Sequence, residues 1–392
     1  MSKTLQSYLK YFAKYYLRRA KPKIIAITGS VGKTSTKNAI FEVLKVHYGE
    51  NVRKSHGNLN NETGVPLAIL GIKKSPSNPF GWVSVLISAK LKSLFGNKVS
   101  ILVLEYAADK PGDLEYLTSF AKPQIAVITG IGPAHLEAFG EMENVVKEKT
   151  SILSSLTEDG LAIINYDDKN LKNIDEESFN LIKYAINAEA DITAKNIFTD
   201  IENYRPITKF QVVSNKNKFQ AELSTLGRSA NIYSALAACA VGENMGLTKD
   251  EIIEGLQNIR SESHRMEVLA GIKGSIIIDD SYNANPLSMR SALDTLEHLS
   301  AKRKIAVLGD MREIGNISDQ AHQLIGEYAH EVANIFIAVG DLAKKYKAEN
   351  YFEDIESATA YLLNEVQEGD MILIKASRAL ALDKIAEALR KS

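Results

Sequence analysis

The 392-residue chain has little cysteine, little net charge and no long hydrophobic run. Its single cysteine, Cys239, excludes an internal disulfide framework and a metal site built from several cysteines. A net charge of −1 gives no global attraction to nucleic acid. No run of about 18 apolar residues occurs, so the sequence predicts no membrane-spanning helix. An apolar leader with a cleavage site is also lacking, and we therefore expect a cytoplasmic protein.

The composition that remains is that of an ordinary globular protein, with 45% hydrophobic and 24% charged residues. The length suits two or three domains with cores of their own. Cys239 lies in the apolar run 235–241, which indicates a buried and inert thiol.

The most informative stretch is residues 24–36, where a β-branched apolar run ends at a glycine-containing turn that opens a predicted helix. Backbone N–H groups of such a turn and helix point at one place and favour an anion there. Lys33 can reach the β- and γ-phosphates of a nucleotide, and the Thr34 hydroxyl suits Mg²⁺. The predicted ATP-binding residues are Thr28, Gly29, Ser30, Val31, Gly32, Lys33, Thr34 and Ser35. Position 27 is isoleucine where the strict Walker pattern has glycine, so an ordinary glycine turn with an incidental lysine is the alternative.

Short apolar runs recur along the chain and predict an α/β fold. The runs at 101–104, 125–129 and 161–165 alternate with helical stretches, the pair 210–213 and 219–223 indicates a hairpin, and new runs begin at 275, 304, 335 and 371. We predict a mostly parallel P-loop sheet with an antiparallel patch, followed by a C-terminal Rossmann-like α/β domain. The expected domains are an amphipathic helix at 1–20, a central domain at 21–262 and a C-terminal domain at 263–392.

Two segments combine apolar and basic residues. Residues 3–19 read as an amphipathic helix with Leu5, Tyr8, Leu9, Phe12 and Tyr16 on one stripe. Residues 72–98 hold five lysines among aromatic and aliphatic residues. Each segment suits peripheral contact with an anionic membrane surface. The alternative is a helix docked on its own domain for residues 3–19, and a surface helix or a mobile insertion for residues 72–98.

Longer motifs follow the phosphate loop in a fixed order. They are G-N-L-N-N-E-T-G-V-P at 57–66, I-T-G-I-G-P-A-H-L-E at 128–137, D-D-S-Y-N-A-N-P at 279–286 and L-G-D-M at 308–311. Together these motifs resemble the Mur ligases of peptidoglycan synthesis, over roughly residues 23–390. The resemblance is closest to the members that add D-alanyl-D-alanine to a UDP-linked muramyl tripeptide.

The resemblance implies ATP-dependent amide bond formation through an acyl phosphate. It assigns one Mg²⁺ to Thr34 and Glu105 and a second to His135, with Lys33 on the phosphates. Lys149 falls where the family carries a carbamylated lysine, whose two oxygens would hold Mg²⁺. Read alone, His135 would be an ordinary loop histidine, Glu105 a solvated carboxylate at the end of a strand, and Lys149 a solvated lysine.

The resemblance also assigns the base and ribose of ATP to Asn283, Asn285, Arg265 and Asp310. It places a substrate-facing loop at Lys375, Ser377 and Arg378. The polar segment with Asn58, Asn60 and Asn61 offers side-chain amides for a polar substrate, and a plain surface loop is the alternative there. Turn formation before Pro286 competes for the two C-terminal asparagines, and a helix N-cap competes for Ser377.

The sequence also departs from the family pattern. Only 27 residues precede Thr28, too few for the N-terminal domain with which the family grips the UDP moiety. Alanines stand at 107 and 376 where glycine is common, and Gly130 stands where asparagine is common. The muramyl substrate is therefore expected to be either UDP-linked or lipid-linked, with no nucleic-acid partner. The alternatives are a folate-type or amidating ligase with another acceptor, and a non-catalytic nucleotide switch.

Overall fold

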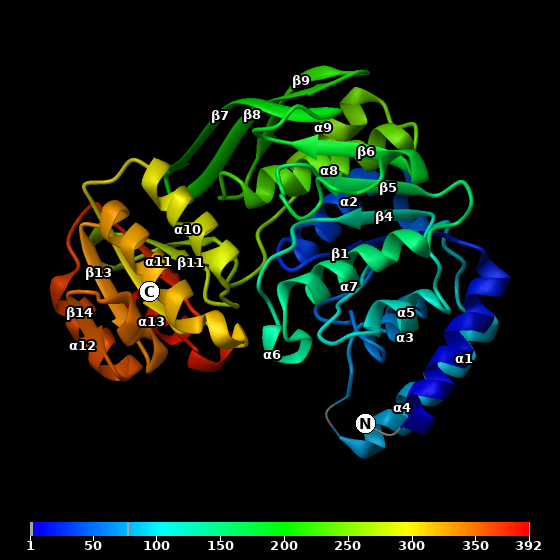
Figure 1. Ribbon diagram of the computed structural model, residues 1–392, viewed down its shortest axis with the longest axis horizontal. Helices are drawn as coiled ribbons and strands as arrows, with labels where there is room; N and C mark the ends of the chain where they lie inside the picture. Colours follow the sequence, from blue (N-terminus) through cyan, green and yellow to red (C-terminus); the bar gives the residue numbers. More distant parts are fainter. Residues whose placement is uncertain (1–2, 77, 392) are drawn as a thin grey trace.

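The computed structural model describes residues 3–76 and 78–391, and its larger sheet has nine strands (Figure 1). In spatial order these are β2 (Val52–Lys54), β3 (Ile101–Glu105), β1 (Lys23–Thr28), β4 (Ile125–Ile128), β5 (Leu161–Asn165), β6 (Asn180–Ala185), β7 (Ile192–Glu202), β8 (Arg205–Ser214) and β9 (Lys218–Leu223). The strands from β2 to β7 pair in parallel, whereas β8 and β9 form an antiparallel hairpin beside β7. The predicted α/β class and hairpin are confirmed.

Helices cover both faces of this sheet, which explains why its central strands are apolar at nearly every position. One face packs on α2 (Lys33–Tyr48), α8 (Ala230–Asn244) and α9 (Lys249–Gln257). The other packs on α1 (Lys3–Ala20), α3 (Gly64–Ile69), α4 (Pro79–Phe95), α5 (Asp113–Thr118), α6 (Leu136–Phe139) and α7 (Met142–Ser154). Cys239 lies inside α8 with no exposed surface, as expected of an inert thiol.

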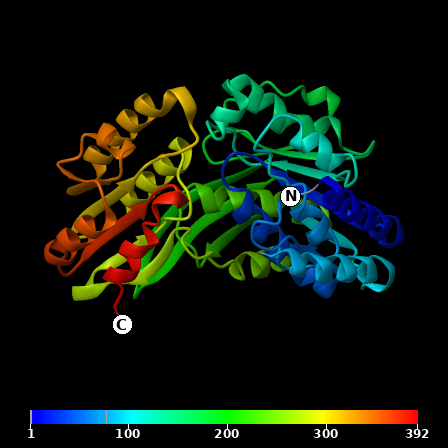
Figure 2. The same ribbon diagram turned by 90° about the horizontal axis from the view of Figure 1, so that it is seen from below.

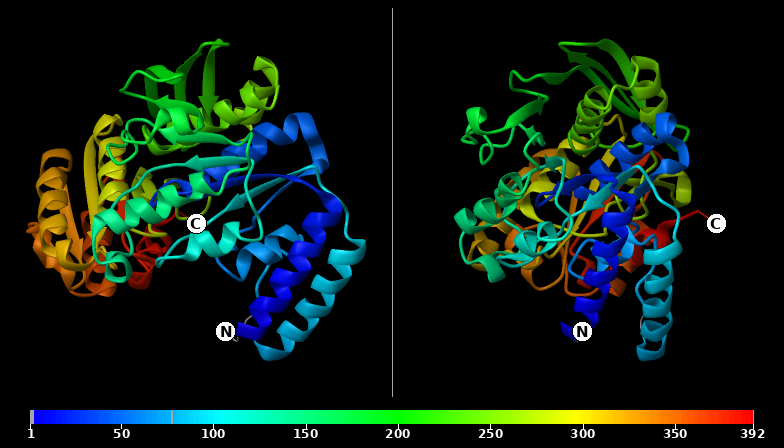
Figure 3. Two further views of the ribbon diagram at one scale, coloured as in Figure 1. Left: turned by 45° about the vertical axis from the view of Figure 1, so that its right-hand side comes forward. Right: turned by 90° about the vertical axis from the view of Figure 1, so that its right-hand side faces the viewer.

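The N-terminal helix α1 docks on its own lobe through Leu9, Ala13 and Tyr16, which are fully buried. The predicted stripe was wrong at Tyr8, whose side chain is 55% exposed. At 3.6 residues per turn the buried face is centred on positions 9, 13 and 16, and Tyr8 falls beyond its edge. Helix α4 lies beside α1 at the margin of the molecule (Figure 3).

The C-terminal lobe has a six-stranded sheet. Its order is β10 (Glu267–Ala270), β11 (Ile276–Asp279), β15 (Asp370–Lys375), β12 (Arg303–Gly309), β13 (Ile335–Val339) and β14 (Asn350–Phe352). All neighbours are parallel except β10. Helices α10 (Pro286–His298) and α11 (Ser318–Val332) cover one face, and α12 (Ile355–Glu365) and α13 (Asp383–Leu389) cover the other.

The two lobes meet along the edge where the phosphate loop lies (Figure 2). Ile201 and Leu226 of the first lobe pack into the core of the second. The amide of Leu136 donates to the carbonyl oxygen of Glu313 at 3.1 Å. The loops that follow β4 and β12 therefore face each other across the lobe boundary. Among the described residues, no helix is both long and apolar enough to cross a bilayer.

Candidate active site

The phosphate loop joins β1 to α2, and its backbone requires glycine at two positions. Gly29 has a φ of +143°, and a Cβ there would lie 2.1 Å from Thr129 Oγ1. Gly32 has a φ of +78° and directly precedes the first residue of α2. A side chain at either position would strain the turn or collide with the neighbouring strand end.

The loop after β4 holds the phosphate loop in shape. The amide of Ser30 donates to the carbonyl oxygen of Gly130 at 2.6 Å, and the Ser30 hydroxyl donates to Gly132 at 2.9 Å. Thr129 Oγ1 donates to the carbonyl oxygen of Val31. These bonds fix the turn so that the N-terminus of α2, with its unpaired N–H groups, faces one place.

Lys33 lies against the loop it follows. Its Nζ donates to the carbonyl oxygen of Gly29 at 2.7 Å and to that of Ser30 at 3.4 Å. Burial lowers the pKa of Lys33, although the charges of Glu105 and Asp109 oppose this shift. The ammonium group therefore lies at the turn that the sequence predicts to bind phosphate.

Glu105 ends β3 beside the start of α2 and is 3% exposed. Its carboxylate accepts from Thr34 Oγ1 at 2.9 Å and from Asn60 Nδ2 at 2.9 Å. Lys37 Nζ lies 3.5 Å from the same carboxylate and is itself 1% exposed. Burial alone would raise the pKa of Glu105. The charges of Lys37 and Lys33 and the two hydrogen bonds outweigh that effect, so the pKa lies below its usual value.

Lys37 was not predicted from the sequence. It stands one helical turn after Lys33, and that spacing was the available signal. Its partner Glu105 is 68 positions away along the chain, so no local pattern connects them.

His135 joins groups from both lobes. Its φ is +56°, and its ring nitrogens lie 2.9 Å from Glu313 Oε2 and 3.4 Å from Asp109 Oδ1. Asp109 follows the end of β3, whereas Glu313 belongs to the C-terminal lobe. Neither acidic residue was singled out from the sequence, because both lie in short loops without a motif.

Lys149 on α7 is 2% exposed, and its Nζ donates to the carbonyl oxygen of Ala108. Burial and the charge of Lys33 lower the pKa of Lys149 to about 7. The lysine is therefore not the plain solvated cation that the sequence left open. A substantial fraction of its amine is neutral near pH 7.

The three asparagines of the 58–61 segment lie in different environments. Asn60 contacts Glu105, as described above, and its carbonyl oxygen accepts from the amide of Ala107 at 2.8 Å. Asn61 Oδ1 accepts from the amide of Gly64 at 2.9 Å and so supports the start of α3. Asn58 is exposed. Only Asn60 of the three touches the predicted metal ligand.

Arg265 lies at the junction of the lobes. Its guanidinium stacks on the Tyr282 ring at 3.9 Å and lies 3.4 Å from Glu262. Glu262 in turn accepts from Asn38 Nδ2 on α2. Arg265 and Ser35 line one small cavity together, so the predicted arginine stands close to the phosphate loop.

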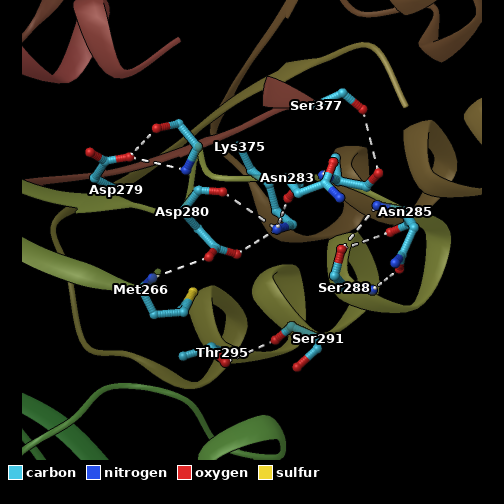
Figure 4. Close-up of polar contacts among 12 residues, drawn as sticks. Met266, Asp279, Asp280, Asn283, Asn285, Ser288, Ser291, Thr295, Lys375 and Ser377 are labelled. Carbon is cyan, nitrogen blue, oxygen red and sulfur yellow. Dashed lines mark hydrogen bonds and ion pairs between the residues drawn. The ribbon is translucent and has the colours of Figure 1, made fainter. Parts of the chain in front are cut away.

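The predicted base-binding asparagines lie before α10 (Figure 4). Asn285 Oδ1 accepts from the amide of Ser288 at 2.9 Å and so caps the N-terminus of α10. Asn283 is exposed, and its carbonyl oxygen accepts from Lys375 Nζ at 2.8 Å. Lys375 is 2% exposed and also binds Asp280 at 2.6 Å. Its ammonium therefore holds the 280–283 turn and is not presented to solvent.

The remaining predicted residues of this lobe lie at the ends of β12 and β15. Asp310 is buried, and its Oδ1 accepts from the amides of Leu342 and Ala343. Ser377 Oγ accepts from the amide of Arg312 at 2.9 Å and makes no cap to the short helix that follows. Arg378 is exposed and pairs with Asp383 at 3.3 Å.

The residues around the phosphate loop fit a nucleoside triphosphate with Mg²⁺. The glycine turn leaves no room for a Cβ at Gly29, as a loop that wraps phosphate requires. The Thr34 hydroxyl and the Glu105 carboxylate meet at 2.9 Å and supply the oxygen ligands that Mg²⁺ prefers.

Comparison with known proteins agrees with this geometry. Residues 27–242 match the Mur ligase middle domain, and residues 264–378 match the Mur ligase, glutamate ligase domain. The UDP-N-acetylmuramoyl-tripeptide–D-alanyl-D-alanine ligase of Bacillus subtilis is 31% identical over 98% of this chain and 79% of its own. That of Escherichia coli is 30% identical over 97% and 79%. The crystal structure of MurF ligase from Thermotoga maritima in complex with ADP superimposes with a TM-score of 0.83 at 27% identity, covering 99% of this chain and 84% of that one. The chain belongs to the Mur ligase family.

Proposed function

We propose that this chain joins D-alanyl-D-alanine to a muramyl tripeptide in peptidoglycan synthesis, using ATP and releasing ADP and phosphate. Its relatives in Bacillus subtilis and Escherichia coli carry this reaction in their names. The observation that carries the proposal is the buried Thr34–Glu105 pair beside a preformed phosphate loop. A nucleotide switch also needs such a loop, but its function does not require the buried Lys149 or His135.

The reaction proceeds in two displacements. A carboxylate oxygen of the tripeptide attacks the γ-phosphorus, and the bond to ADP breaks. The amine of the dipeptide then attacks the carbonyl carbon, phosphate leaves with the shared oxygen, and the amine loses a proton. Bound Mg²⁺ supplies positive charge to the phosphoryl oxygens.

The chain's own residues position the reactants and offset charge. Lys33 places its ammonium at the turn where the transferring phosphoryl group sits, and the N-terminus of α2 adds backbone N–H groups. Thr34 and Glu105 would hold the first Mg²⁺, and Asn60 and Lys37 fix the carboxylate. His135 would hold a second cation, and Lys149 would supply oxygen ligands to it once carbamylated.

The C-terminal lobe completes the nucleotide site. Arg265, placed beside Ser35, adds positive charge toward the phosphates. Asn283, Asn285 and Asp310 surround the base and ribose, although Asn285 also caps α10 and Asp310 also accepts two backbone N–H bonds from a distant loop. Asn58 and Arg378 are exposed and face the amide-forming substrates, whereas Lys375 and Ser377 shape the turns behind them.

Lys149 is proposed to be carbamylated. Carbon dioxide adds to a neutral amine, and a pKa of about 7 leaves the Lys149 amine largely neutral at pH 8. The adduct loses a proton to water and becomes an anion with two oxygens, which attracts the neighbouring ammonium of Lys33.

We expect enzyme in ¹³C-bicarbonate to show a carbamate resonance by NMR that grows between pH 6 and pH 8, because protonation of Lys149 below its pKa blocks the addition. Lys149→Ala should abolish the carbamate resonance and lower kcat about a hundredfold. Lys147→Ala, an exposed neighbour on the same helix, should change neither. A resonance that persists in Lys149→Ala would contradict the assignment.

The function is tested by the substrate requirement for phosphate release. UDP-muramyl tripeptide and a lipid-linked analogue are each offered with D-alanyl-D-alanine, single amino acids or ammonia. We expect release only when a muramyl tripeptide and the dipeptide are both present, with an amide product detected by mass spectrometry. Release with ammonia alone would indicate an amidating subunit, and slow release without either substrate would indicate a switch.

A further inference from the structure

Helix α4 presents an apolar stripe to solvent. Phe80, Val83, Ile87, Leu91 and Phe95 are between 53% and 88% exposed. They recur every three or four residues and so lie on one side of the helix. The opposite side, at Ala89 and Ser93, is buried, and Ala89 belongs to the same core cluster as residues 9 and 13 of α1. A contiguous exposed stripe of this kind marks an interaction surface.

The segments that form α1 and α4 carry charge of one sign. Residues 1–23 hold seven lysines or arginines and residues 72–98 hold five, and neither segment contains an aspartate or glutamate. The rest of the chain contains 35 basic and 48 acidic residues. Lys73 and Lys74 precede α4 and Lys98 follows it, so cations stand at both ends of the stripe.

A groove beside α1 is also lined by basic side chains. It is lined by Lys14, Arg18, Lys21 and Lys122 together with Ser119 and Gln124. The groove adds four basic residues beside α1, in a protein with a net charge of −1.

We propose that α4 lies on the surface of an anionic lipid bilayer, with its apolar stripe among the acyl chains and the flanking lysines at the lipid phosphates. The 17 residues of α4 span about 25 Å, and none of the described helices can cross a bilayer, so the helix lies along the surface. A second copy of this chain fits the stripe less well, because a two-fold interface would bring the lysines of both copies together. This inference does not depend on the ligase reaction.

The test is co-sedimentation of the full chain with vesicles. We expect binding to phosphatidylglycerol vesicles that weakens with salt, and little binding to pure phosphatidylcholine. Ile87→Ser/Leu91→Ser removes two exposed apolar side chains and should weaken binding at least tenfold. Lys73→Glu/Lys74→Glu/Lys98→Glu should weaken binding about a hundredfold at low salt and reduce the salt dependence.

Leu324→Ser is the matched control, because Leu324 is a 56% exposed leucine on α11 of the other lobe. It should bind vesicles as the unaltered chain does. Circular dichroism and analytical ultracentrifugation accompany every variant. No binding to anionic vesicles at low salt overturns the proposal, as does unchanged binding by Ile87→Ser/Leu91→Ser. A lipid-free dimer that the same variant dissociates would also overturn it, in favour of a second copy.

Discussion

Replacing Lys33 by methionine is expected to lower kcat for amide formation by about a thousandfold or more. A cation aimed at a transferring phosphoryl group is worth on the order of 10³ in rate. The ammonium of Lys33 already lies at the phosphate-binding turn, bonded to the carbonyl oxygens of Gly29 and Ser30. Phosphate release and amide product, measured together, report the loss.

The matched control is Lys45→Met, which removes an exposed lysine from the same helix. It should leave kcat within about twofold of the unaltered enzyme, and both variants should unfold at similar temperatures. Equal activity in Lys33→Met and Lys45→Met would show that the loop does not act on phosphate.

Glu105→Gln is expected to damage both catalysis and stability. Loss of the carboxylate weakens the Mg²⁺ site and should lower kcat about a hundredfold or more at saturating ATP. The same change leaves Lys37, 1% exposed, without its carboxylate. Breaking a buried ion pair by removing one partner costs about 3 kcal/mol in the free energy of unfolding. Urea denaturation and steady-state kinetics measure the two losses separately.

The double variant Lys37→Met/Glu105→Gln separates the two effects. Removal of the orphaned cation should restore most of the free energy of unfolding, while activity stays low. If Glu105→Gln alone were as stable as the unaltered chain, Lys37 would not depend on this carboxylate. If the single variant kept full activity, Glu105 would not be a metal ligand.

Local sequence patterns were sufficient for the parts of the fold that depend on neighbours in the chain. The turn at residues 28–34 was readable because glycines, a lysine and a flanking apolar run occur together. The hairpin of β8 and β9 was readable from two alternating runs around a polar turn. The longer motifs identified the Mur ligase family. The matches over 27–242 and 264–378 confirm this family and the ATP-dependent ligase class.

Contacts between distant segments were beyond local patterns. Lys37 meets Glu105 only after β3 pairs with β1, and Glu313 reaches His135 only across the lobe boundary. The buried position of Lys375 depends on the turn at Asp280, which no spacing reveals. The assigned roles of the site residues, the two metal positions and the domain limits stay predictions.

Oxygen transfer tests the activation of the carboxylate most directly. The muramyl tripeptide is labelled with ¹⁸O in the reacting carboxylate and incubated with ATP, Mg²⁺ and D-alanyl-D-alanine. If the carboxylate attacks phosphorus, the released phosphate carries one ¹⁸O and the amide keeps the other. Unlabelled phosphate formed in step with the amide would contradict an acyl phosphate and the chemistry assigned to this site.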